Sequence, residues 1–217
     1  MSSVGSTPGA SMSGTSGGPM TQMLVIRHGQ STWNEERRWQ GQADPPLSDF
    51  GRSQAGEASR SIGQVDVIIS SPQIRAAETA SIIGAAIGVG PVQTLDGLQE
   101  RSAGEWSGLT RNEIDTRWPG WVDSDRRPEG WEPDTELTAR VMAAMERIAT
   151  EFDGATVLVV CHGGVIIAME KALGVNDGRI PNLHGRVVNR IDGSLVGGDR
   201  LQLIPDEMRT GGESNRV

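Results

Sequence analysis

Apolar residues along this chain follow two patterns. Short continuous apolar runs end at glycine, serine or proline, and longer segments repeat apolar positions every three to four residues. The first pattern predicts buried strands and the second predicts amphipathic helices. We expect strands at residues 23–26, 65–69, 92–95, 156–160, 186–191 and 200–204, the last two flanking an Asp192-Gly193 turn. We expect helices at residues 48–62, 72–87, 109–118, 135–152 and 163–173.

Three of the predicted helices carry further signals. Ser48 has the side chain of a helix N-cap, and Pro72 suits the first turn of the helix over 72–87. The residues of that helix expected to face inward are Ile74, Ala77, Ile82 and Ile83. The helix over 135–152 has an apolar face formed by Leu137, Val141, Met145 and Ile148.

The order of these elements predicts the fold class. Strands alternating with helices indicate an α/β protein, here a three-layer α/β/α sandwich with a mostly parallel central sheet. Residues 21–205 are long enough for one domain with a full core. Residues 1–20 are rich in glycine and serine, which predicts a disordered tail, and residues 206–217 are predicted to be a flexible C-terminal tail.

Composition restricts the partners and the compartment. The formal net charge of −8 argues against nucleic acid or an anionic membrane as the main partner. No apolar run is long enough to span a bilayer. Cys161 is the single cysteine, so an internal disulfide is excluded, and residues 1–20 lack the apolar core of a secretory signal. We therefore expect a cytoplasmic location.

Two of the predicted strands are each followed by a histidine and a glycine. The apolar run 24–26 is followed by Arg27, His28 and Gly29, and the run over 156–160 is followed, after Cys161, by His162 and Gly163. Ligands of α/β sheets bind at the carboxyl ends of the strands. Two histidines and an arginine at one such place suit a phosphate oxyanion, with one histidine as the nucleophile.

Longer blocks around these residues resemble a known family. They are 27–34 (RHGQSTWN), 38–48 (RWQGQADPPLS), 51–55 (GRSQA), 70–80 (SSPQIRAAETA), 98–101 (LQER) and 162–164 (HGG). In this order and spacing they resemble the histidine phosphatase superfamily, which includes the phosphoglycerate mutases. The resemblance covers about residues 22–204 and implies a phosphoglycerate mutase-like fold.

The resemblance assigns a role to each matching residue. It implies that His28 attacks phosphorus to form N-phosphohistidine and that Glu100 is the general acid, with Glu105 as the alternative. His162 is the second catalytic histidine and donates to the phosphoryl oxygens. The residues that it implies for substrate binding are Arg27 and Arg75 as the phosphate clamp, Asn34 as an amide donor, and Gln40, Gly41 and Gly163.

Two activities fit this resemblance, a phosphatase and a cofactor-dependent phosphoglycerate mutase. Mutases usually continue the acid block as Glu-Arg-His-Tyr-Gly, whereas residues 100–104 read ERSAG and the chain has no tyrosine. The stretch from Glu100 to Thr135 also looks shorter than in a mutase, and Arg126-Arg127 only faintly matches a mutase arginine pair. We therefore favour a phosphatase.

A non-catalytic relative that binds phosphorylated ligands is a third hypothesis. A disabled enzyme is expected to have lost at least one of the five residues that carry the chemistry. The chain retains all of them: Arg27, His28, Arg75, Glu100 and His162. This hypothesis is therefore the weakest of the three.

The expected partner is a small phosphorylated metabolite, and a homodimer is compatible with the sequence. No cofactor and no metal are expected, because the arginines and histidines supply the positive charge at the phosphoryl group. Four of the six tryptophans fall between residues 106 and 131. Those outside the core are candidates for an apolar wall that selects a bulky leaving group.

Overall fold

The computed structural model describes residues 20–209. Residues 1–19 of the predicted N-terminal tail and residues 210–217 of the predicted C-terminal tail lie outside this range. In the described part of the second tail, the 3-10 helix η3 (Asp206–Met208) follows the last strand. Gln54 Nε2 donates to the Met208 carbonyl at 2.8 Å, which holds η3 on the domain.

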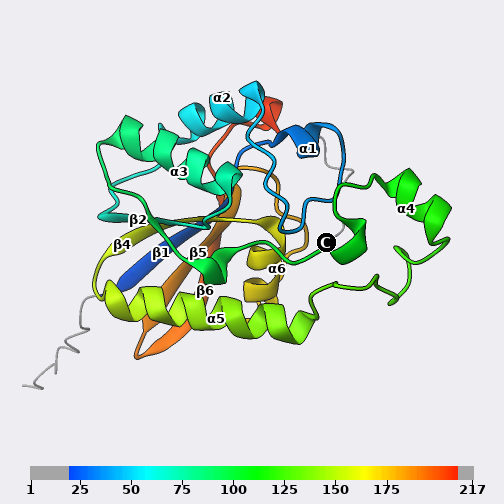
Figure 1. Cartoon of the computed structure of the whole chain (residues 1–217). Helices are drawn as coiled ribbons and strands as arrows, with labels where there is room; N and C mark the ends of the chain where they lie inside the picture. Colours follow the sequence, from blue (N-terminus) through cyan, green and yellow to red (C-terminus); the bar gives the residue numbers. More distant parts are fainter. Residues whose placement is uncertain (1–19, 210–217) are drawn as a thin grey trace, which may run out of the picture.

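A six-stranded sheet forms the centre of the molecule, in the order β3-β2-β4-β1-β5-β6 (Figure 1). The strands are β1 (Thr21–Arg27), β2 (Val67–Ser70), β3 (Gln93–Thr94), β4 (Thr156–Cys161), β5 (His184–Ile191) and β6 (Ser194–Gln202). The first four are mutually parallel, and the β5–β6 hairpin continues the sheet antiparallel beside β1. The predicted α/β class with a mostly parallel sheet is confirmed.

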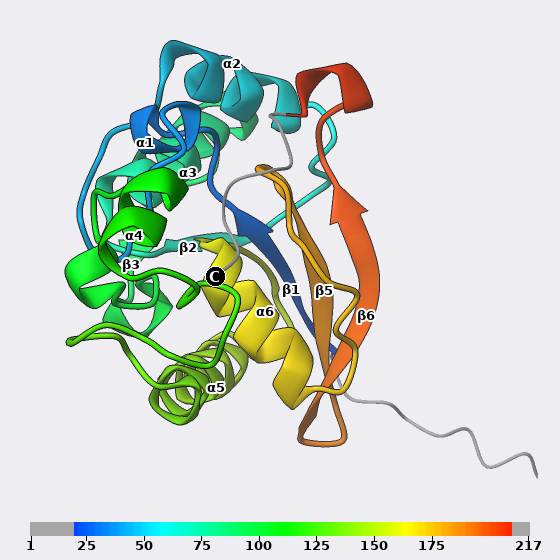
Figure 2. The ribbon, with the colours of Figure 1, turned by 90° about the vertical axis from the view of Figure 1, so that its right-hand side faces the viewer.

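Helices cover both faces of this sheet, as Figures 1 and 2 show. Helices α2 (Asp49–Ala58) and α3 (Ile74–Ile87) lie on one face. Helices α5 (Asp134–Glu151) and α6 (Gly163–Ala172) lie on the other. The short helices α1 (Thr32–Glu35) and α4 (Arg111–Arg117) and the 3-10 turns η1 (Asp96–Leu98) and η2 (Gly104–Trp106) belong to the connections.

The alternation of side chains along the central strands creates the two cores. On β4, Val157 and Val159 pack in the core shared with α5 and α6, whereas Leu158 and Val160 pack in the core shared with α2 and α3. Because successive strand residues point to opposite faces, an unbroken apolar run is required where both faces are covered. The predicted apolar face of α5 is confirmed: Leu137, Val141, Met145 and Ile148 are buried.

Helix α3 departs from its predicted start. Gln73 is its N-cap and Pro72 precedes the helix. The buried face centres on Ala76, Ala80 and Ile83. Ile74 lies about 200° around the helix from Ala76 and is 48% exposed, so the expectation that it faces inward was wrong.

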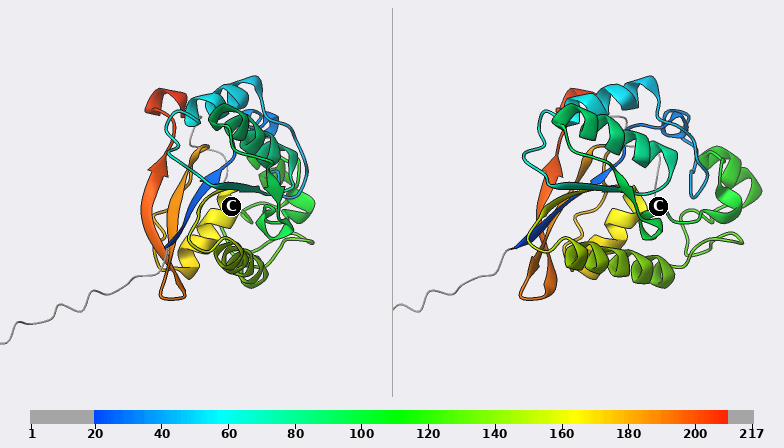
Figure 3. Two further views of the ribbon diagram at one scale, coloured as in Figure 1. Left: turned by 90° about the vertical axis from the view of Figure 1, so that its left-hand side faces the viewer. Right: turned by 60° about the vertical axis from the view of Figure 1, so that its left-hand side comes forward.

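The β5–β6 hairpin is longer than predicted. Asp192 and Gly193 form its turn with φ angles of 49° and 80°, so β6 starts at Ser194 rather than near residue 200. Glycines 197 and 198 interrupt the side-chain alternation of β6, which is why the sequence pattern missed its first half. Figure 3 shows the hairpin at one edge of the sheet.

Candidate active site

The register of the sheet brings two histidines together at the carboxyl ends of β1 and β4. Arg27 pairs with Cys161, and the His28 amide donates to the Cys161 carbonyl at 3.0 Å. His28 and His162 therefore follow adjacent strand ends, with ring centroids 5.1 Å apart in an edge-to-face arrangement. Both rings are buried, at 2% and 0% exposure. The predicted convergence of the two His-Gly strand ends matches this geometry.

His28 is held as a neutral ring with one nitrogen available. Its Nδ1 lies 2.6 Å from the Gly29 carbonyl, which can only accept, so Nδ1 carries the proton. Burial, together with Arg75 and Arg27 nearby, lowers the pKa of His28 well below its ordinary value. The Nε2 lone pair faces Arg75, whose Nε lies 3.3 Å away. This nitrogen is the nucleophile candidate.

Two buried arginines flank the His28 ring. Arg75 donates from Nη1 to the Ala43 carbonyl at 2.8 Å and from Nη2 to the Gly41 carbonyl at 3.0 Å. Arg27 donates from Nη1 to the Ile180 carbonyl at 2.8 Å. Burial lowers the pKa of each guanidinium to about 10, so both stay protonated at neutral pH.

His162 caps the start of α6 and lies behind His28. Its Nε2 is 2.8 Å from the Ser71 hydroxyl, and burial lowers its pKa well below the ordinary value. Two buried nitrogens at this place, His162 Nδ1 and Arg27 Nε, have no hydrogen-bond partner among residues 20–209. Buried polar atoms are normally paired, so two such atoms beside a nucleophile fit an anionic ligand.

Glu100 supplies the carboxylate of the site. It is 8% exposed, and its Oε1 and Oε2 accept from the backbone amides of Arg101 at 2.8 Å and Gly164 at 3.2 Å. Arg140 of α5 donates from Nη2 to the Glu100 carbonyl at 3.1 Å. Glu105, the alternative acid, is exposed and does not line the pocket. The geometry therefore favours Glu100.

Arg27, His28, Arg75 and Glu100 border a pocket of about 550 Å³, whereas the predicted catalytic residue His162 does not line it. Most of the predicted site residues line it, namely Arg27, His28, Gln40, Gly41, Arg75, Glu100 and Gly163. Asn34 does not line it: its Oδ1 accepts from the Ser31 amide at 3.1 Å and caps α1. The role of Asn34 as an amide donor to the phosphoryl group stays a prediction.

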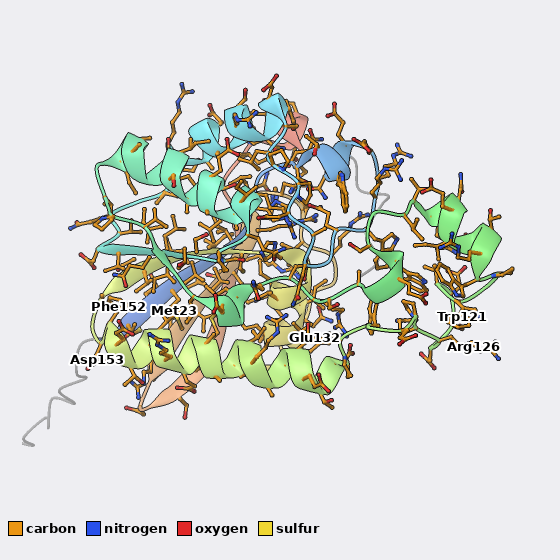
Figure 4. The ribbon with its side chains drawn as sticks, viewed as in Figure 1. Met23, Trp121, Arg126, Glu132, Phe152 and Asp153 are labelled. Atoms are coloured by element: carbon orange, nitrogen blue, oxygen red, sulfur yellow. The ribbon has the colours of Figure 1, made fainter. Side chains whose placement is uncertain are left out.

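The tryptophans divide into two groups. Trp39 and Trp131 line the pocket in edge-to-face contact, 5.9 Å apart, and Trp106 packs behind them. Trp118 and Trp121 contact each other outside the pocket. Figure 4 shows Trp121 and Arg126 at the outer end of the molecule, beyond Glu132. Only part of the tryptophan-rich stretch forms the expected wall.

A model of the histidine phosphatase superfamily, branch 1, matches residues 23–190. The chain belongs to this superfamily. A glucosyl-3-phosphoglycerate phosphatase of Mycobacterium tuberculosis is 36% identical over 167 residues, covering 70% of this chain and 74% of the relative. A bifunctional protein of the same organism is 35% identical over 176 residues, covering 77% of this chain and 48% of the relative. The chain thus spans about half the length of that protein.

Solved structures agree with this assignment. A mycobacterial glucosyl-3-phosphoglycerate phosphatase superposes with a TM-score of 0.69 at 30% identity, covering 78% of this chain and 90% of the other. YhfR of Bacillus stearothermophilus superposes with a TM-score of 0.75 at 26% identity, covering 82% and 95%. The resemblance of the sequence motifs to the phosphatase branch of the histidine phosphatase superfamily is confirmed.

Several residues of this histidine phosphatase site were not predicted. Arg101, Arg179 and Ile180 line the pocket, and Asn182 Nδ2 donates to the His28 carbonyl at 2.8 Å. Gln73 makes three hydrogen bonds to two segments of the site, although the motif that contains it gives it no role of its own. Arg101 and Gln73 lie within motif blocks, which is the one available signal. Nothing in the pattern distinguishes Arg179.

Metal-binding groups and membrane-spanning helices are both absent from the described part of the chain. Between residues 20 and 209, no three histidine, cysteine, aspartate or glutamate side chains are grouped so that they could hold a metal ion. Within the same range, no helix combines the length and the apolar character needed to cross a membrane.

Proposed function

We propose that this protein hydrolyses a small phosphomonoester through a phosphohistidine at His28. The observation that carries the proposal is the arrangement around His28 Nε2. A neutral nucleophilic nitrogen lies beside Arg75, while Arg27 Nε and His162 Nδ1 lack partners among the described residues. A phosphoryl group at this nitrogen would accept from all of these donors.

The reaction has two displacements. His28 Nε2 attacks phosphorus, the bond to the leaving-group oxygen breaks, and protonated Glu100 gives its proton to that oxygen. A water molecule then attacks the phosphohistidine, Glu100 takes a proton from it, and inorganic phosphate leaves. Arg27, Arg75 and His162 stabilise the charge of the phosphoryl oxygens in both steps.

The pocket gives less support to the mutase alternative, because the residues that would hold a phosphoglycerate are not in place. A mutase must hold the phosphoglycerate so that the phosphoryl group returns to its other hydroxyl. Arg126 and Arg127, the faint match to a mutase arginine pair, do not line the pocket. Arg127 instead donates from Nη1 to the Ser124 carbonyl at 2.7 Å, and its guanidinium lies 5.3 Å from the Trp131 ring centroid.

The leaving group that we propose is a polar organic residue with an acidic group. Beyond the phosphoryl site the pocket has flat surfaces from Trp39 and Trp131 and cations from Arg101 and Arg179. Such walls suit a ring or a carbon chain that carries a carboxylate. Glucosyl-3-phosphoglycerate, on which two similar phosphatases act according to their names, is the first compound to test.

We also propose that the reaction needs no metal, because the two arginines place positive charge at the phosphoryl group. A cytoplasmic location and a homodimer remain predictions.

Trapping of the phosphoenzyme tests the proposed function. Wild-type protein mixed with a labelled phosphomonoester should acquire an acid-labile, base-stable label, and His28→Ala should lose both the label and turnover. The chain has three histidines, and His184 is buried outside the pocket. His184→Gln is therefore the matched control and should keep the label. Turnover retained by His28→Ala would refute the mechanism.

A further inference from the structure

Gln73 is a buried side chain with no role in the mechanism above. It sits between β2 and α3 as the N-cap residue of α3, yet its side chain makes no capping hydrogen bond. The residue is 4% exposed. Its carboxamide turns toward the loop over residues 41–43 and toward Glu100 instead.

The carboxamide joins the phosphate clamp to the acid. Gln73 Nε2 donates to the carbonyls of Gly41 at 3.2 Å and Ala43 at 3.3 Å. The same two carbonyls accept from Arg75 Nη2 and Nη1. Gln73 Oε1 accepts from the Glu100 amide at 2.7 Å. One planar group therefore shares the anchors of Arg75 and also holds the backbone of Glu100.

These contacts need a carboxamide. Two donors and an acceptor must act from one side-chain end, whereas a carboxylate lacks the donors and a thioether lacks the donors and accepts only weakly. The Glu100 carbonyl accepts from Arg140 Nη2 at 3.1 Å and from Gln42 Nε2 at 3.3 Å, and its carboxylate accepts from the Arg101 and Gly164 amides. Gln73 adds the contact that ties the Glu100 backbone to the two carbonyls that anchor Arg75.

We propose that Gln73 is a positioning residue that fixes Glu100 relative to the Arg75 clamp, so that its proton reaches the leaving-group oxygen. The proposal rests on the proposed function. A misplacement of about 1 Å can lower a rate by about 100-fold. The effect is largest for an alkyl phosphate, because its leaving alkoxide needs a proton whereas nitrophenolate hardly does.

Rapid-quench measurement of phosphoenzyme formation in Gln73→Met tests this directly. The first-step rate with an alkyl phosphate should fall by roughly 10- to 100-fold. The rate with para-nitrophenyl phosphate should fall by about threefold or less. The inhibition constant of inorganic phosphate should stay within about threefold of wild type, because Arg75 keeps both carbonyl contacts.

Gln54 provides a matched control. It is also a buried glutamine that joins two backbone segments: Oε1 accepts from the Gln30 amide at 2.8 Å and Nε2 donates to the Met208 carbonyl at 2.8 Å. Gln54→Met should lower stability without changing the ratio of the two phosphoryl-transfer rates. An equal change of that ratio in both variants would mean that Gln73 has only a structural role.

Gln73→Glu keeps an acceptor for the Glu100 amide. Its first-step rate with the alkyl phosphate, relative to that with para-nitrophenyl phosphate, should therefore fall less than in Gln73→Met. If Gln73→Met does not fold, this variant decides: it supports the proposal if the alkyl phosphate slows more than the nitrophenyl ester. Equal slowing of both esters overturns the proposal. A wild-type protein that forms no phosphoenzyme would instead refute the proposed function itself.

Discussion

Glu170 allows a quantitative test of the packing that supports the site. It lies on α6 about 10 Å along the helix axis from Gly163, at 1.5 Å per residue. Its carboxylate is fully buried and accepts from Arg186 Nε at 2.7 Å and Arg200 Nη2 at 2.9 Å. The ion pairs join α6 to β5 and β6, and α6 in turn supplies Gly163 and Gly164 to the pocket region.

Glu170→Gln should lower the free energy of unfolding by about 3 kcal/mol. Removing one partner of a buried ion pair costs roughly 3–5 kcal/mol, because the other charge stays buried without compensation. Asp177 still pairs with Arg186, which places the expected cost at the lower end. For a domain of this size, each kcal/mol shifts the Tm by about 2–4 °C, so the Tm should fall by roughly 6–12 °C.

Urea unfolding followed by tryptophan fluorescence measures this loss, with Glu57→Gln as the matched control. The Glu57–Arg60 pair has the same 2.7 Å separation, but its side chains are 32% and 76% exposed. Exposed pairs contribute little, so Glu57→Gln should unfold close to wild type. If the two variants differ by less than about 1 kcal/mol, burial does not set the strength of the Glu170 pairs, and the reasoning fails.

The remaining predictions concern catalysis. Glu100→Gln should slow hydrolysis of an alkyl phosphate by roughly 100-fold or more, measured as single-turnover phosphoenzyme formation, whereas Glu105→Gln should match wild type. Dialysis against EDTA should leave the rate unchanged; a loss restored by magnesium or zinc would contradict the proposed charge stabilisation. The lowered pKa values of His28 and His162 should keep kcat/KM from falling as pH drops through 6.5. Stability should instead fall below pH 6.5, by up to about 1.4 kcal/mol per pH unit for each histidine, because only the unfolded chain binds those protons.

The sequence predicted the site best at the two histidines, because each directly follows an apolar run that forms a buried strand. The apolar runs ending at His28 and His162 predicted that both histidines lie at the carboxyl end of the sheet, and the parallel β1–β4 pairing makes them neighbours. A buried strand leaves few choices of register, because a shift by one residue would expose its apolar side chains. The apolar pattern therefore predicts strands that deliver both histidines to one edge of the sheet, and the strand order of the structure supplies their proximity.

Contacts made by polar side chains between distant segments were harder to predict. Gln73 reaches residues about 30 positions away in both directions along the chain, and neither its spacing nor its type indicates such a role. The LQER block favours Glu100 over Glu105, but the residue pattern does not show that Glu100 is buried and that Glu105, within the 3-10 turn η2, is exposed. Side-chain burial in the structure therefore adds a physical distinction to the one that the motif makes.

Burial explains the charge states of both the arginines and the histidines at the site. Burial lowers the pKa of arginine and of histidine alike, but the ordinary pKa of arginine is far higher than that of histidine. Arg75 ends at about 10 and stays a cation, whereas His28 becomes a neutral nucleophile at physiological pH. A lysine in place of Arg75 would start from a lower pKa than arginine, so the same burial would bring its pKa closer to neutral pH and cost it part of its charge. Arginine is therefore the cation that can share a buried site with an uncharged histidine. It keeps its charge under the same burial that leaves the histidine neutral.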